Sequence, residues 1–304
     1  MAKILVSGLI NTETTVKVKQ FPIPYYPIDY PFIGVNTQVA GVAYNVAKAL
    51  TVLGDEVTIC TMTGTDFAAD CISAQMRENG LSDQYVKKNL QQTPNTAVLY
   101  DEQGKRQIYC DLKDIQETSY GFTADMYAAC DLVVACNTNF NRELLAKAKE
   151  AGKIIATDVH VLSDIEDDYN ADFMRYADIL FLSDEHIPTD YKRFLTDIAE
   201  QYENQIIVLG RGDKGVCMYL REGNIFHELA AVSTGAVVNT VGAGDALFSG
   251  FVHYYAKGCE PREALLRAEI AASMKIGHDG AAQGFPDEEK VEAFYQIYGR
   301  ETIL

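Results

Sequence analysis

Short apolar runs alternate along the chain with longer stretches in which apolar residues recur at helical spacing. The runs have the length of buried strands and are Ile4 to Ile10, Val57 to Thr61, Leu132 to Cys136, Ile154 to Thr157, Ile179 to Leu182 and Ile206 to Leu209. Periodic segments such as Val42 to Leu53 and Asn141 to Ala151 lie between them. This order predicts βαβ units, and hence an α/β fold with a doubly wound, mainly parallel sheet flanked by helices.

Two stretches interrupt this order and predict a small β-sheet lid. Residues 12–39 are rich in proline and tyrosine, which excludes a helix because proline lacks an N–H donor and restricts the residue before it. In the second stretch, Thr96 to Tyr100 and Arg106 to Cys110 flank the turn Asp101-Glu102-Gln103-Gly104, a pattern typical of a hairpin. We expect both stretches, about 12–39 and 96–111, to be lid strands inserted into a single domain that spans residues 1–304.

Towards the C-terminus the pattern changes to a strand pair followed by helices. Gly215 to Leu220 and Asn224 to Leu229 predict a second hairpin. Helical periodicity follows over Gly242 to Ala256, Pro261 to Ile276 and Pro286 to Tyr298. The first of these helices carries the segment with the clearest chemical signal.

Charge and cysteine content narrow the class of protein. The 304 residues include 26 Lys plus Arg against 43 Asp plus Glu, so the formal net charge is −17. A chain this acidic repels polyanions, and we expect no nucleic-acid partner and no membrane partner. The seven cysteines are scattered without a Cys-x-x-Cys pair, and no apolar run approaches the ~20 residues that span a bilayer. These features predict reduced thiols and a cytoplasmic protein.

The segment Thr240-Val241-Gly242-Ala243-Gly244-Asp245 joins a polar turn to an apolar helix. Gly242, Ala243 and Gly244 are small enough for a ligand to approach the backbone, and the first N–H groups of a helix have no intrahelical acceptor. We expect them to form an anion hole for a phosphate, with Asp245 beside it as the base that takes a proton from an attacking hydroxyl. The alternative is structural: the glycines turn the chain, and Asp245 stabilises the helix dipole by ~0.3–1 kcal/mol.

This segment resembles the C-terminal signature of the ribokinase family, also called the phosphofructokinase B family of carbohydrate and nucleoside kinases. From Asn239 to Asp245, every position but the first matches that signature, Asp-Thr-x-Gly-Ala-Gly-Asp. Gly8 to Glu13 resembles the family's first strand, which ends in a substrate-binding Asn-x-Asp, although Glu13 stands here where Asp is usual. Ala40 to Ala47, Thr63 to Asp66 and Gly212 to Gly215 also fall at the family's usual places. The resemblance implies ATP-dependent phosphorylation of a hydroxyl on a sugar or nucleoside.

The resemblance also implies which residues bind each substrate. Those expected to contact the sugar or nucleoside, together with Asp245, are Asn11, Glu13, Gly41, Asn45, Asn137 and Asn139. Those expected to contact ATP are Thr240, Gly212, Lys214 and Gly215. Each has a simpler reading, since an Asn in a helix can bond its own backbone and a carboxylate at a strand end is often only solvated. Aromatic side chains of the lid could stack on a base, pack on each other, or pair two lids in a homodimer.

Two departures from the family pattern concern cations. The family's Asn-x-x-Glu, which helps to hold Mg²⁺, is replaced by Ser183-Asp184-Glu185-His186. Asp184 or Glu185 could supply the carboxylate that Mg²⁺ prefers. His186 could be a metal ligand, but a histidine that faces solvent at the start of a helix is the simpler interpretation. Asn239 replaces the Asp that joins a monovalent-cation site in many members, so we expect activity that depends little on potassium.

Two other functions compete with a kinase. Gly210-Arg211-Gly212-Asp213-Lys214-Gly215 matches the dinucleotide pattern Gly-x-Gly-x-x-Gly, but a strand pattern follows it where that fingerprint requires a helix. We therefore exclude a nicotinamide oxidoreductase. A catalytically degenerate relative that binds sugar or nucleotide as a regulator remains the alternative. The intact Gly-Ala-Gly-Asp core favours the kinase.

Overall fold

The computed structural model describes residues 1–103, 105–187 and 190–302, so Gly104 in the expected lid turn lies outside the described residues. The strands of its larger sheet are β1 (Lys3–Ser7), β4 (Glu56–Thr63), β5 (Val86–Lys88), β8 (Leu132–Ala135), β9 (Ile154–Val161), β10 (Ile179–Ser183), β11 (Ile206–Gly210), β12 (Val216–Leu220) and β13 (Ile225–Leu229). Their order is β13-β12-β11-β10-β9-β8-β1-β4-β5. The strands from β11 to β5 are parallel, whereas β12 and β13 are antiparallel. The predicted mainly parallel sheet is confirmed.

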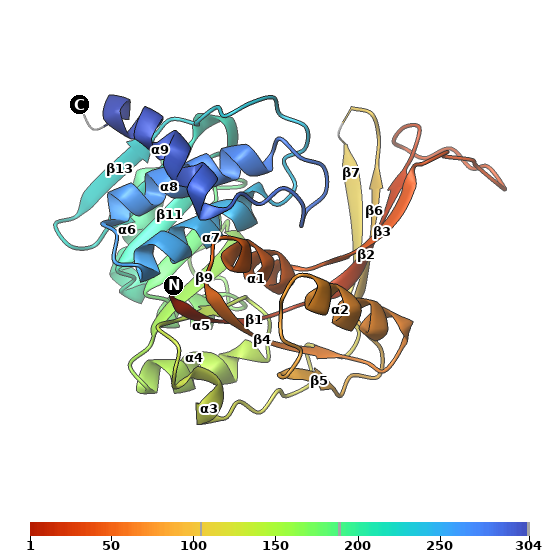
Figure 1. Cartoon of the computed structure of the whole chain (residues 1–304), viewed down its shortest axis with the longest axis horizontal. Helices are drawn as coiled ribbons and strands as arrows, with labels where there is room; N and C mark the ends of the chain where they lie inside the picture. The colour runs from red at the N-terminus through yellow and green to blue at the C-terminus, as the bar shows by residue number, and fades with distance from the viewer. Residues whose placement is uncertain (104, 188–189, 303–304) are drawn as a thin grey trace.

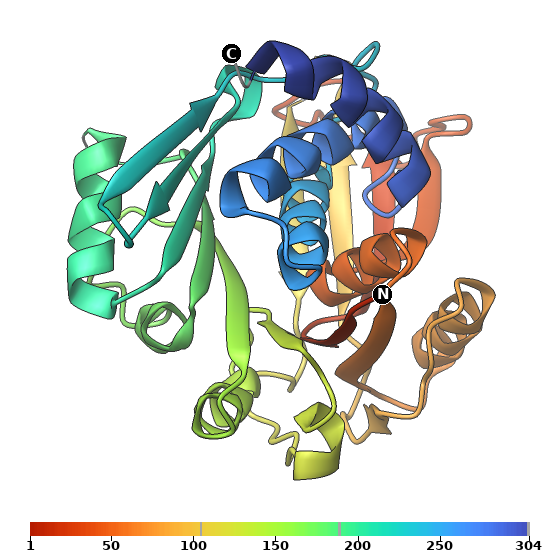
Figure 2. The same cartoon turned by 60° about the vertical axis from the view of Figure 1, so that its left-hand side comes forward.

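Helices cover both faces of this sheet (Figure 2). One layer contains α1 (Val42–Val52), α2 (Phe67–Glu78), α7 (Ala243–Ala256), α8 (Pro261–Lys275) and α9 (Glu288–Thr302). The other contains α3 (Ala124–Tyr127), α4 (Asn141–Glu150), α5 (Ala171–Tyr176) and α6 (Tyr191–Tyr202). Each layer forms its own apolar core against the sheet, because strands covered on both sides are apolar on both sides.

Four of these helices, α2, α3, α5 and α6, were not among the segments predicted as helical. The two longer ones, α2 and α6, are amphipathic, with buried residues at helical spacing such as Ile72 and Met76 in α2 or Leu195 and Ile198 in α6. Each is capped by an aspartate: the Asp66 carboxylate accepts from the N–H of Ala69 at 3.1 Å, and that of Asp190 accepts from Lys192 at 2.9 Å. Such caps satisfy N–H groups that the helix itself leaves unpaired.

The lid is a separate four-stranded sheet that projects from the α/β body (Figure 1). Its strands are β2 (Asn11–Lys17), β3 (Val35–Ala40), β6 (Asn95–Tyr100) and β7 (Arg106–Asp111), in the order β3-β2-β6-β7. The expected strand content of residues 12–39 was partly wrong. Residues 18–34, which hold the prolines, form no strand because proline cannot donate to a sheet ladder.

The first strand is also shorter than expected. It ends at Ser7, so Asn11 and Glu13 lie on lid strand β2 rather than at the end of the first strand. Gly8 packs directly under Cys136, where an added Cβ would lie 2.7 Å from the Cys136 sulfur. After the chain has left the sheet, Leu9 is half-buried and Ile10 is fully buried.

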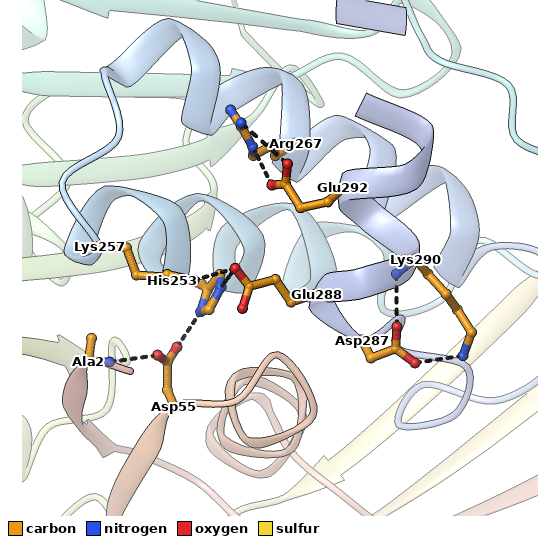
Figure 3. A network of polar contacts seen from close by, with 9 residues as sticks. All are labelled: Ala2, Asp55, His253, Lys257, Arg267, Asp287, Glu288, Lys290 and Glu292. Atoms are coloured by element: carbon orange, nitrogen blue, oxygen red, sulfur yellow. Dashed lines mark hydrogen bonds and ion pairs between the residues drawn. The ribbon is translucent and has the colours of Figure 1, made fainter. Parts of the chain in front are cut away.

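A buried polar network anchors α7 from its far end (Figure 3). Asp55, just before β4, accepts a hydrogen bond from the N–H of Ala2 at 3.0 Å, and its other oxygen lies 2.7 Å from Nδ1 of His253 on α7. Glu288 on α9 pairs with Lys257, and its carboxylate lies 3.9 Å from Nε2 of His253. These contacts join the N-terminus, β4, α7 and α9, and so fix the helix whose first turn carries Asp245.

Candidate active site

The candidate site lies at the edge of the sheet where the parallel strands end. Asp245 interacts electrostatically with Asp158 and His160 of β9, and also with Cys136, which follows β8. Two residues further along α7, a methyl group of Leu247 lies 3.8 Å from the position a Cβ would take on Gly210, at the end of β11. The first turn of α7 thus meets the carboxyl ends of β8, β9 and β11. This is the edge at which α/β sheets bind their ligands.

The first turn of α7 leaves backbone donors free. The N–H of Ala243 donates to the carbonyl of Thr240 at 3.2 Å, and that of Ala246 to Gly242 at 3.0 Å. Among the described residues, the N–H groups of Gly242, Gly244 and Asp245 have no such acceptor. The N–H groups of Gly242, Gly244 and Asp245 are therefore available to an anion, whereas the N–H of Ala243 is engaged in the turn.

The two glycines of this turn have different reasons for lacking a side chain. Gly242 has a φ of 82°, and a Cβ there would lie 2.4 Å from the carbonyl oxygen of Ala281. The fold itself requires glycine at this position. At Gly244 a Cβ would meet open space. The space above Gly244 is where a ligand could approach the backbone.

Asp245 is held in a setting that suits a base. Its carboxylate accepts a hydrogen bond from Nδ2 of Asn45 at 2.7 Å. Burial raises its pKa from 3.8 to about 6; the Asn45 hydrogen bond and the His160 ring oppose this rise in pKa, while the charge of Asp158 adds to it. A carboxylate with a pKa near 6 is ionised at neutral pH and is more basic than an exposed aspartate.

Asn45 reaches Asp245 because α1 packs against α7. Gly41, just before α1, has a φ of 104°, and a Cβ there would lie 2.5 Å from the carbonyl oxygen of Leu9. Glycine at this position lets α1 begin directly against the strand connection. Oδ1 of Asn45 is buried and has no protein partner in the described part of the chain. It remains an acceptor for a hydroxyl group.

The lid contributes Asn11 and Glu13. Asn11 donates through Nδ2 to Thr96 at 2.6 Å, and its Oδ1 is buried with no partner in residues 1–103, 105–187 and 190–302. Glu13 accepts from Gln38 at 3.1 Å. The Gln38 side chain in turn lies 3.3 Å from the Cβ position of Gly280, in the loop after α8. The lid therefore meets the loop that packs under Gly242.

Asn137 and Asn139 follow β8, and their side chains differ in how many of their polar atoms are hydrogen-bonded to the protein. Both amide atoms of Asn139 are engaged: Nδ2 donates to the carbonyl of Gln116 at 3.2 Å, and Oδ1 accepts from Arg142 at 3.3 Å. The side chain of Asn139 is therefore held by neighbouring protein groups on both its nitrogen and its oxygen. Asn137 donates to Asn170 at 3.2 Å through Nδ2.

The predicted ATP loop follows β11. The expectation of a strand after Gly215 is confirmed by β12, which excludes the dinucleotide reading. The fold requires glycine at position 215, because a Cβ there would lie 2.1 Å from the carbonyl oxygen of Leu229. Gly212 would place a Cβ in open space. Lys214 lies 3.9 Å from the Asp184 carboxylate, and Thr240 is exposed at the turn before α7.

The expected metal ligands lie at the end of β10. The N–H of Asp184 donates to the carbonyl of Gly210 at 2.9 Å, which places this segment beside the end of β11. Glu185 donates its N–H to the Ser183 hydroxyl at 3.3 Å, and its side chain is exposed. In the described ranges no three His, Cys, Asp or Glu side chains are grouped so that they could hold a metal ion by themselves.

Lys275, at the end of α8, was not predicted as part of the site. This side chain is 0% exposed, and its ammonium donates to the carbonyl oxygens of Val241 at 2.9 Å and Gly280 at 2.8 Å. Its only sequence signal is a single charged residue in the apolar stretch from Ile270 to Ile276. A lysine there usually reaches the surface, so pattern alone does not reveal its burial.

The site can be compared with known families. A family model described as pfkB family carbohydrate kinase matches residues 1–288. The chain belongs to this family. The resemblance seen in the Asn239 to Asp245 segment is thereby confirmed, and as a pfkB family member the chain is an ATP-dependent kinase of the carbohydrate and nucleoside kinase class. The catalytically degenerate alternative is not favoured.

Three proteins show what the chain is similar to. A nucleoside kinase of Methanocaldococcus jannaschii is 23% identical over 311 residues, which cover 96% of each chain. The structure of a microbiome-derived acarbose kinase matches with a TM-score of 0.85 at 22% identity, covering 96% of this chain and 98% of the other. That of Arabidopsis thaliana ribokinase complexed with ribose and ATP matches with a TM-score of 0.81 at 18% identity, covering 96% and 98%. The ribokinase-like fold with its lid is confirmed.

Proposed function

We propose that this pfkB family member transfers the γ-phosphoryl group of ATP to a hydroxyl of a sugar or nucleoside, with Asp245 as the general base. The observation that carries the proposal is the first turn of α7. There a carboxylate whose pKa is raised to about 6 stands next to the free N–H groups of Gly244 and Asp245. A base and an anion site thus lie within one helical turn.

The step follows from this arrangement. The acceptor hydroxyl loses its proton to the Asp245 carboxylate as its oxygen bonds to the γ-phosphorus, and the bond from that phosphorus to the bridging oxygen of ADP breaks. The free N–H groups hold the negative charge that develops on the phosphoryl oxygens. Gly242 keeps the turn in the conformation that presents these donors.

On the acceptor side, amide and carboxylate groups suit sugar hydroxyls. Asn11 and Asn45 each keep a buried oxygen without a protein partner in the described structure, and both oxygens can accept from a hydroxyl. Glu13 and Asn137 extend the polar lining, and Gly41 lets α1 approach. Similar proteins named for nucleosides, acarbose and ribose support the sugar and nucleoside class as acceptor.

On the donor side, the residues present fit a nucleotide. Gly212 and Gly244 both leave open space where a side chain would stand, Lys214 offers an exposed positive charge, and Thr240 lies beside the turn. Gly215 serves the fold. Mg²⁺, when bound, neutralises phosphate charge, and the carboxylates of Asp184 and Glu185 are of the type it prefers, since it usually takes one or two carboxylates plus phosphate oxygens.

The lid supports a proposal about assembly. Its loop carries exposed apolar side chains, among them Tyr25 at 88%, Phe32 at 87% and Ile33 at 96%. Apolar side chains gathered in this way mark interaction surfaces, and we propose a homodimer formed through the lid. The seven free cysteines support a cytoplasmic location. Within the described residues, no helix is long and apolar enough to cross a membrane.

The test is ATP consumption with Mg²⁺ across ribose, fructose, 2-keto-3-deoxygluconate, adenosine, inosine and pseudouridine, with Asp245→Ala as control. We expect at least one acceptor to stimulate turnover and the substitution to abolish it. Thermal stabilisation by ATP, measured in parallel, separates binding from catalysis. ATP binding with no turnover on any acceptor would replace the kinase by the binding protein.

A further inference from the structure

We propose that Lys275 is a positioning residue whose ammonium acts as a tethered cation beneath the anion hole, in place of a bound monovalent metal ion. The inference rests on the proposed function, since it concerns the same turn of α7. It assigns a role to a residue outside the family signature and explains why this chain should need no potassium there.

The first support is the geometry of the ammonium. Nζ of Lys275 donates to the carbonyl oxygen of Val241, the residue before Gly242, and to that of Gly280, in the loop after α8. The same loop presses the carbonyl of Ala281 against Gly242. One cation thus joins the two segments that shape the anion hole.

The second support is closeness to the hole itself. Cε of Lys275 lies 3.2 Å from the position of a Cβ on Gly242. The side chain is 0% exposed, so the charge acts through protein rather than through water, where it would be screened. A fixed positive charge below the turn favours both the γ-phosphate and the ionised form of Asp245.

The third support is the ligand set. Two converging carbonyl oxygens are ligands that a monovalent metal ion would use, and here an ammonium occupies their centre. Burial lowers the pKa of Lys275, and the charges of Asp245 and Asp279 act in the opposite direction. The residues present therefore do not fit a second cation at these two carbonyls, because two positive charges would share one set of oxygens.

The side chain of Asn239 also holds the turn before Gly242. Its Nδ2 donates to the Asp279 carboxylate at 2.8 Å, and its Oδ1 accepts from the N–H of Val241 at 2.9 Å. The position where many family members carry an aspartate is neutral here and shapes the same turn. A metal ion at this place would be helped by a carboxylate at position 239. The Lys275 ammonium is already held by two carbonyl oxygens, so a neutral asparagine is sufficient there.

A purely structural crosslink would use the same hydrogen bonds, so the test must depend on charge. The variants are Lys275→Ala, which leaves space for a small cation, and Lys275→Met, which fills that space without charge. Lys149→Ala is the control, because Lys149 is a surface lysine that pairs with Asp178. For each protein, kcat, KM for ATP and the ATP-induced shift in Tm are measured in sodium, potassium, ammonium or methylammonium chloride at constant ionic strength.

We expect the unmodified protein to show the same kcat in all four salts. Lys275→Ala should lose about 100-fold in kcat, as when one donor of an anion hole is removed, and regain a saturable part with ammonium or methylammonium. Lys275→Met should lose as much without rescue. A several-fold activation of the unmodified protein by potassium, or full kcat in Lys275→Met, would overturn the proposal.

The salt dependence of the unmodified protein needs no variant, so the proposal stays testable even where Lys275→Ala fails to fold. The shift in Tm with ATP is independent of turnover. It should be smaller in Lys275→Met than in the unmodified protein, and an equal shift together with equal kcat would contradict the inference. Absence of turnover in the unmodified protein with every acceptor would instead refute the proposed function.

Discussion

Replacing Asp245 by asparagine should make the protein more stable at neutral pH while it removes the base. Burial raises the pKa of Asp245 from 3.8 to about 6. Between these values the folded protein binds more protons than the unfolded chain, so stability falls as pH rises through roughly 4 to 6 and stays lower above that window. Asp245→Asn removes this cost and leaves an oxygen that can still accept from Asn45.

The magnitude follows from the shift in pKa. About two pKa units correspond to roughly 3 kcal/mol at full burial, and partial exposure of the side chain reduces this to about 2 kcal/mol. For a chain of this size the gain amounts to about 4 °C in Tm at pH 8. At pH 4, where the carboxyl is largely protonated in both states, the two proteins should unfold at nearly the same temperature.

The assay is thermal and urea unfolding of both proteins at pH 4 and pH 8, with Asp172→Asn as a matched control because Asp172 is a surface carboxylate paired with Arg142. A stability gain confined to pH 8, together with lost turnover, is the expected result. Equal or lower stability of Asp245→Asn at pH 8 would show that burying the ionised carboxylate does not destabilise the fold, and the account of its raised pKa would be wrong.

Three further predictions concern the turn and the core. Gly244→Ala should keep Tm within ~1 °C but weaken ATP binding. Gly242→Ala should lower Tm, because the added Cβ would collide with the carbonyl of Ala281. Equal losses of Tm in the two variants would contradict this contrast. Asp55→Ala should cost about 3 kcal/mol in urea unfolding by leaving buried donors unpaired, and a loss below 1 kcal/mol would refute it. Burial raises the pKa of Glu269 to about 7, so Glu269→Gln should stabilise the protein above pH 7 and not at pH 4; unchanged Tm at pH 8 would count against this.

Much of the α/β body could be predicted because its strands are buried on both faces. An apolar run such as Leu132 to Cys136 has one stable place, inside the sheet, and β8 covers Leu132–Ala135. The run from Ile4 to Ile10 was misleading in its second half. Apolar content reports burial, and Leu9 and Ile10 are covered by packing after the chain has turned away from β1.

The glycine-rich turn and Asp245 could be singled out from the local sequence, but the residues that contact them from other elements could not. Glycines followed by an aspartate at a helix start indicate an anion site from local rules alone. The partner of Asp245, by contrast, comes from a helix about 200 positions earlier, and its position was expected only from the resemblance. The burial of Lys275 could not be predicted either. Whether a lysine reaches water or a buried carbonyl depends on tertiary packing, which the local sequence pattern does not encode.

The most direct test of the account compares kcat of the unmodified protein and Asp245→Asn on the best acceptor, with the Kd for ATP measured on the same samples. General base catalysis contributes about 10²- to 10⁴-fold. The account predicts a fall in kcat of at least 100-fold with ATP affinity unchanged within a few fold. A variant that keeps kcat within tenfold of the unmodified protein would contradict the role of Asp245 as the base.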